Sequence, residues 1–61
     1  MSYPIPLDPD IALWVSTLDI NTRELFEERA GIREYDGGLS RAEAEIEARN
    51  DVLRWLQKDQ I

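Results

Sequence analysis

The segment from Tyr35 to Glu43 ends one helix and begins another, and it constrains the fold more than any other part of the sequence. Gly37 and Gly38 predict a helix end, because glycine readily takes the left-handed backbone conformation that closes a helix C-terminus. Ser40 and Glu43 have the spacing of a capping box, in which each side chain accepts a hydrogen bond from the other residue's backbone amide. A connection this short predicts an antiparallel αα-hairpin.

The two helices of this hairpin are expected over about residues 21–36 and 41–58. Either Asp19 or Asn21 supplies the cap at the start of the first one. Apolar residues recur along one side of that helix at helical spacing. They are Leu25, Phe26, Ala30 and Ile32.

A third, shorter helix is expected over about residues 9–18, because Asp8 can cap it and Pro9 suits its first position. Prolines at positions 4 and 6 predict an extended arm over residues 1–7. A helix this short is marginal alone in water, so it must pack on the hairpin. The sequence therefore predicts a single small all-α domain spanning residues 1–61.

The chain has 61 residues with no Cys and no His, so neither a disulfide nor a histidine-bound metal can stabilise its fold. A domain of this size buries only about 60% of the surface that its unfolded chain exposes. Its stability must therefore come from helix packing or from association with a second chain.

The last helix carries an apolar arc that is too wide for one neighbouring helix to cover. The arc comprises Ala44, Ala48, Val52 and Trp55, continued by Leu56, Leu53, Ala42 and Ile46. One interpretation is a three-helix core with this helix in the middle. The other is that Ile46 and Leu53, one heptad apart, form a seam for a second chain. The candidate interface residues are Ile46, Leu53, Leu56, Trp14 and Trp55.

Two arginines lie on the apolar stripe of the second helix, and a glutamate lies inside the arc of the third. Residues that flank the turn of a hairpin face each other, so we expect Arg29 or Arg33 to pair with Glu45. Such a salt bridge would fix the register of the hairpin, since a guanidinium binds a carboxylate in a rigid fork. Alternatively, a half-buried pair is retained for the specificity of an interaction.

Thirteen acidic and seven basic residues give a net charge of −6, which disfavours direct binding to nucleic acids. The acidic surface of the second helix comprises Glu24, Glu27, Glu28 and Glu34. These carboxylates form either a solvated face or an acidic patch, one that a basic protein recognises or one that imitates the charge of DNA. No apolar run approaches the roughly 20 residues that cross a bilayer, and no signal peptide pattern is visible, so we expect a cytoplasmic protein.

Catalysis has little chemical basis in this sequence. It has no His or Cys nucleophile or base, no glycine-rich phosphate loop and no spacing typical of metal ligands. We therefore expect no enzymatic activity, no metal and no cofactor.

Residues 28–48 read ERAGIREYDGGLSRAEAEIEA. This stretch resembles a helix-turn-helix segment written E-R-x-x-I-x-E-[FY]-D-G-G-L-x-R-x-E-A-E, which is found in small bacterial and phage proteins and at the ends of replication or primase-like proteins of mobile elements. It departs from the common form at Gly31, where a second alanine is usual. The resemblance implies a helical hairpin and a mobile-element context, and it implies no catalytic residues.

Together these observations predict a small protein-interaction module or accessory subunit, acting as a homo-oligomer or on a larger protein. The alternative is an accessory or acidic decoy in mobile-element DNA replication or other DNA-binding processes.

Overall fold

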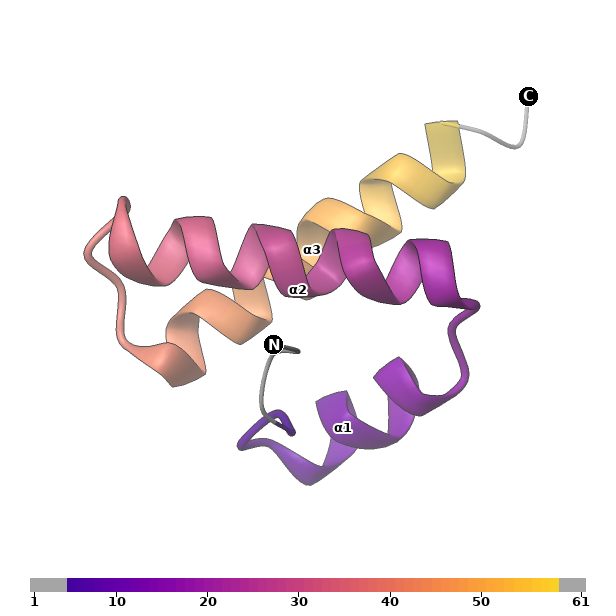
Figure 1. Ribbon diagram of the computed structural model, residues 1–61, viewed down its shortest axis with the longest axis horizontal. Helices are drawn as coiled ribbons and strands as arrows, with labels where there is room; N and C mark the ends of the chain where they lie inside the picture. Colours follow the sequence, from indigo (N-terminus) through magenta and orange to yellow (C-terminus); the bar gives the residue numbers. More distant parts are fainter. Residues whose placement is uncertain (1–4, 59–61) are drawn as a thin grey trace.

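The computed structural model describes residues 5–58, and within them the chain forms three α-helices and no strand (Figure 1). Helix α1 spans Pro9–Ser16, α2 spans Ile20–Tyr35 and α3 spans Arg41–Lys58. The predicted all-α class is confirmed, and the expected helix limits differ from the observed ones by at most two residues. The first four residues of the predicted arm lie outside the described residues.

Helix α2 packs on α3, and α1 contacts both of them. In Figure 1, α3 crosses behind α2 obliquely, and the last turns of α3 extend beyond the crossing. Helix α1 lies below this pair in the same view, and Ile5 and Leu7, which precede it, bond to Arg41 and Glu45 of α3. One side of the α2–α3 pair is therefore covered by α1.

Six buried apolar side chains form the core of the described chain, two from each helix. They are Ile11, Val15, Phe26, Ala30, Ala48 and Val52. Trp14, Leu25 and Leu56 pack against this cluster from its edge. The rings of Trp14 and Phe26 meet edge to face, with centroids 5.8 Å apart and an interplanar angle of 77°. Helix α1 thus takes part in the core, as the three-helix interpretation expects.

The first two helices begin at aspartates. Asp8 accepts hydrogen bonds through Oδ1 from the backbone amides of Asp10, at 2.8 Å, and Ile11, at 3.4 Å. The cap predicted at Asp8 is therefore confirmed. The cap of α2 is Asp19 rather than Asn21, and the Asp19 side chain makes no capping hydrogen bond.

The connection between α2 and α3 uses both of its glycines. Gly38 has a φ of +70°, the left-handed region that other residues rarely adopt. At Gly37 an added Cβ would lie 2.7 Å from the backbone oxygen of Arg33, so a side chain there would clash. The capping box is also confirmed: Ser40 Oγ accepts from the Glu43 amide at 3.2 Å, and Glu43 Oε1 accepts from the Ser40 amide at 3.3 Å.

The segment before α1 is tied to α3 by two side chains of α3. The Glu45 side chain is fully buried, and its Oε1 accepts a hydrogen bond from the backbone amide of Leu7 at 2.9 Å. Arg41 donates from Nε to Glu45 Oε2 at 3.2 Å and from Nη2 to the backbone oxygen of Ile5. Because a buried carboxylate without partners is costly, these bonds hold the segment in place.

Ile32 was expected on the buried side of α2, and that prediction is wrong: the side chain is 40% exposed. The buried line of α2 runs through Thr22, Phe26 and Ala30, at intervals of four residues. Ile32 lies about 120° around the helix from Phe26 at ~100° per residue. It therefore lies outside the buried line of α2.

We predict that Gly31→Ala stabilises the fold. A Cβ at Gly31 meets no atom within 4 Å, so alanine should raise the free energy of unfolding by about 0.5–1 kcal/mol through its higher helix propensity. Gly38→Ala is the matched control, and it should lower that free energy by about 1 kcal/mol because alanine disfavours a positive φ. Urea unfolding followed by circular dichroism measures both; a destabilised Gly31→Ala variant would contradict the prediction.

Candidate functional site

A cluster of charged side chains joins α2 to α3. Its centre is Asp51 of α3, whose side chain is 11% exposed. Asp51 Oδ2 accepts from Nε of Arg29 at 3.2 Å and from Nε of Arg33 at 3.1 Å. Asp51 Oδ1 accepts from Nη2 of Arg33 at 2.9 Å, and Arg54 donates to the same oxygen. One carboxylate therefore binds three guanidinium groups.

The predicted pairing of Arg29 or Arg33 with Glu45 is wrong, because both arginines bind Asp51 instead. Glu45 and Asp51 are six residues apart, which places them about 120° apart around α3. Asp51 faces α2, whereas Glu45 faces the segment before α1. The expectation that an inter-helix ion pair joins α2 to α3 through these arginines holds, but with a different carboxylate.

Burial alone would raise the pKa of the Asp51 carboxyl, but hydrogen bonds from Arg33 and Arg29 and their positive charges outweigh it and hold this pKa below its usual value. The hydrogen bond and the charge of Asp51 likewise raise the pKa of Arg33 above its usual value. Asp51 thus stays ionised at neutral pH, and the cluster keeps its charges.

Beside this cluster α2 and α3 leave an open hollow of about 310 Å³. It is lined by Leu25, Arg29, Asp51, Arg54 and Trp55. Trp55 is 46% exposed, so a large part of its surface faces solvent. The hollow therefore combines an aliphatic side chain and an aromatic side chain with cationic groups.

The outward side of α3 carries a second exposed feature, the Ile46–Leu53 strip. The two residues are 41% and 40% exposed. They lie about 140–160° around α3 from the buried Ala48. Of the five candidate interface residues, Ile46, Leu53 and Trp55 are exposed, whereas Trp14 and Leu56 are partly buried against the core.

The acidic residues of α2 are distributed around its outer surface. Glu24 and Glu28 are exposed, whereas Glu27 and Glu34 are partly buried. Glu27 pairs with Arg23 one turn before it, at 3.8 Å between Oε2 and Nε. The acidic surface expected from the sequence is thus most accessible at Glu24 and Glu28.

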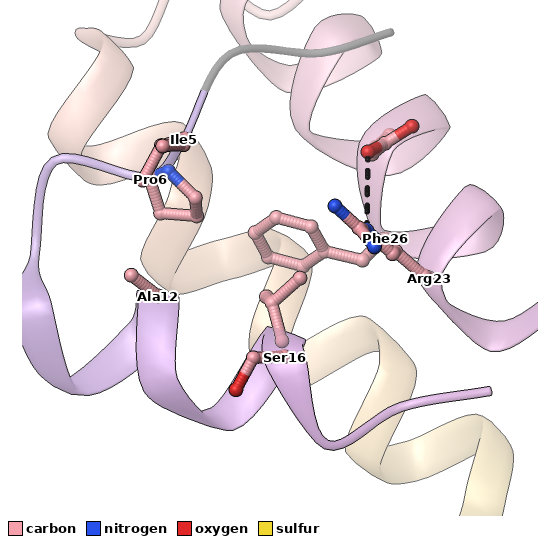
Figure 2. Close-up of a pocket in the computed structure, with 8 residues that line it drawn as sticks. Ile5, Pro6, Ala12, Ser16, Arg23 and Phe26 are labelled. Atoms are coloured by element: carbon pink, nitrogen blue, oxygen red, sulfur yellow. Dashed lines mark ion pairs between the residues drawn. The ribbon is translucent and has the colours of Figure 1, made fainter. Parts of the chain in front are cut away.

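A further hollow of about 270 Å³ lies between the segment before α1, α1 itself and α2 (Figure 2). The ring of Phe26 projects into it from α2, toward Pro6 and Ile5. The polar groups at its edge are already occupied: the Ser16 hydroxyl donates to the Leu13 backbone oxygen at 2.6 Å, and Arg23 pairs with Glu27. The arrangement is therefore a packing hollow, without a nucleophile and base in contact.

No group of three or more potential ligand side chains that could hold a metal occurs within residues 5–58. Among the helices of the described chain, none has the length and apolar character to cross a bilayer. Comparisons of the chain with protein-family models, with curated proteins and with solved structures found no match.

The sequence interpretation gave no role to Asp51. One local signal pointed to it, since Asn50 and Asp51 are adjacent poor helix formers in the middle of α3. A residue that lowers helix propensity at an interior position is often retained for a contact of its side chain. The contact of Asp51 with Arg29 and Arg33 depends on how α2 and α3 cross, and no pattern of neighbouring residues in the sequence predicts that crossing.

We predict that the Asp51 cluster contributes to stability in a pH-dependent way. Because the folded-state pKa of Asp51 is lowered, this contribution is fully present above the unfolded pKa of about 3.9 and is lost as the pH falls through the folded value. The urea midpoint of the wild type should therefore fall more steeply below about pH 4 than that of Asp51→Asn. Parallel declines of the two midpoints would show that the cluster adds no such dependence.

Proposed function

We propose that this chain is a small protein-interaction module or accessory subunit without catalytic activity, in which α2 and α3 act as an antiparallel αα-hairpin. The observation that carries the proposal is the Ile46–Leu53 strip, whose side chains are 41% and 40% exposed although they lie on a regular helix beside a small core. A second helix packed along the strip would bury both side chains. The proposed first partner is a second copy of the chain.

Two-fold symmetry gives the strip a self-complementary arrangement. In an isologous dimer of antiparallel α3 helices, Ile46 of one copy meets Leu53 of the other, and the reverse contact forms at the same time. Arg49 and Asn50 then lie near the symmetry axis. The Asn50 side-chain oxygen can accept a hydrogen bond from the Arg49 guanidinium of the other copy.

Association would add apolar burial that the fold alone does not supply. Full burial of a Leu or Ile side chain contributes about 1.5–3 kcal/mol, so burying the remaining surface of each strip residue adds roughly 1 kcal/mol. Four such side chains per dimer offset only part of the entropic cost of association. A dimer at micromolar concentration therefore requires further exposed side chains to join the interface.

We predict that the chain forms a dimer at micromolar concentration and that Leu53→Asp is monomeric, because a charge would enter a dry contact. Analytical ultracentrifugation measures the mass, and circular dichroism checks that the variant keeps its helix content. Leu13→Asp is the matched control, since Leu13 is 69% exposed on α1, outside the strip, and its substitution should leave the dimer intact. A monomeric wild type at these concentrations would contradict self-association.

A second candidate function is that of an accessory or acidic decoy for a basic, DNA-binding protein of a mobile element. The exposure of Glu24 and Glu28, four residues apart on α2, favours it, together with the net charge of −6. Electrostatic docking of this kind guides association and weakens as salt rises.

For the decoy function, joint replacement of Glu24, Glu27, Glu28 and Glu34 by Gln should abolish binding to basic proteins without loss of helix content. Affinity capture from a host lysate at about 50 mM and about 300 mM salt tests this, because screening acts on exposed charges. The decoy predicts basic DNA-binding proteins that only the wild type retains at low salt and that added DNA displaces. If neither salt nor the four substitutions change the set of captured proteins, the acidic surface is excluded as the binding surface.

A further inference from the structure

Positive charge is concentrated at one place on this acidic chain. Arg29, Arg33 and Arg54 surround the single carboxylate of Asp51. The cluster therefore has a local excess of two positive charges, on a chain whose net charge is −6. These guanidinium groups can attract an anionic group on a chain that is otherwise mostly acidic.

The carboxylate of Asp51 does not engage all the N–H donors of the three arginines. Its two oxygens accept four hydrogen bonds from the three arginines, which matches the approximate number of lone-pair sites of a carboxylate. Arg29 donates only through Nε and Arg54 only through Nη2 within residues 5–58. A guanidinium has five N–H donors, so both residues retain donors for a second acceptor. Their side chains are 37% and 67% exposed.

The hollow beside these donors has apolar sides. Leu25 of α2 and Trp55 of α3 line it together with Arg29, Arg54 and Asp51, around a volume of about 310 Å³. If a ligand places an apolar side chain between Leu25 and Trp55, a neighbouring polar group of that ligand lies near the unused N–H donors of Arg29 and Arg54. Exposed Trp and Arg side chains of this kind are the residue types that dominate binding energy at protein interfaces.

We propose that this hollow binds a segment of another protein in which a carboxylate neighbours an aliphatic or aromatic side chain. The carboxylate lies between Arg29 and Arg54, and the apolar side chain packs against Leu25 and Trp55. Charge-assisted hydrogen bonds of a guanidinium to a carboxylate give both strength and orientation. This inference rests on the proposed protein-interaction function, but it uses a surface separate from the Ile46–Leu53 strip, which lies on another side of α3.

The surroundings favour a short acidic protein segment over nucleic acid. Glu28 precedes Arg29 on α2, and Glu47 lies near enough to Arg33 to affect its pKa. Duplex DNA carries one phosphate charge per about 1.7 Å of its axis, so an extended polyanion would place phosphates over these carboxylates. A single carboxylate needs only the unused N–H donors of Arg29 and Arg54.

The test uses the full 61-residue chain and two capped peptides, acetyl-GLEFEG-amide and the neutral acetyl-GLQFQG-amide. Titration followed by NMR should shift the indole N–H signal of Trp55, assigned with Trp55→Phe, and leave that of Trp14 nearly unchanged. The acidic peptide should bind at least about tenfold more tightly than the neutral one, as expected for charge-assisted hydrogen bonds.

Arg54→Gln should weaken binding of the acidic peptide by about fivefold or more, since it removes the most exposed cationic donor of the hollow. Arg23→Gln is the matched control, because Arg23 is 58% exposed on α2 and outside the hollow. Equal binding of the two peptides, or no shift of Trp55 at millimolar peptide, would overturn the proposal. A larger Trp55 shift with a single-stranded DNA oligonucleotide would also overturn it, in favour of a nucleic-acid surface.

The Leu53→Asp variant allows peptide binding and self-association to be tested separately. If Leu53→Asp is monomeric and still binds the acidic peptide, both proposals stand on separate surfaces. If the wild type is monomeric and binds the peptide, the dimer proposal fails and the peptide site stands. If the wild type is a dimer that binds neither peptide, the peptide site fails alone.

Discussion

The packing of α2 on α3, with Ala30 and Ala48 buried in the shared core, is the contact on which the rest of the structure depends. Both alanines are fully buried, and their small side chains let the two helix backbones approach. The approach brings the arginines of α2 within reach of Asp51 on one side. On the other side it leaves Phe26 to pack against α1, so the core is completed by a helix too short to be stable alone.

Two carboxylates on different sides of α3 bind different parts of the chain. Asp51 binds arginines of α2, and Glu45 binds the backbone amide of Leu7. A buried charge without its partner is costly, so each carboxylate favours the arrangement in which its partners are in place. Here they specify which side of α3 faces α2 and which faces the segment before α1.

Local signals in the sequence predicted the fold well, and long-range ones did not. The Asp8 cap, the glycine stop and the Ser40–Glu43 box depend on residues a few positions apart, so the helix limits could be predicted closely. The partner of Arg33 depends on how two helices cross, and the burial of Ile32 depends on where α1 packs. For the candidate site, the spacing of apolar residues pointed to Ile46, Leu53 and Trp55, which are exposed, whereas the hollow beside Asp51 had no signature in the spacing.

The hydrogen bond between Leu7 and Glu45 joins residues 38 positions apart and closes most of the chain into a non-covalent ring. Contacts of high sequence separation carry a loop-closure cost, so they form after the nearby contacts of α2 with α3. The ring is therefore expected to close last in folding and to open first in unfolding. Opening it, together with the bond between Arg41 and Ile5, would release Ile5 and Leu7 from α3 and uncover the buried Glu45, so that a charge is exposed and a helix loosens in the same event.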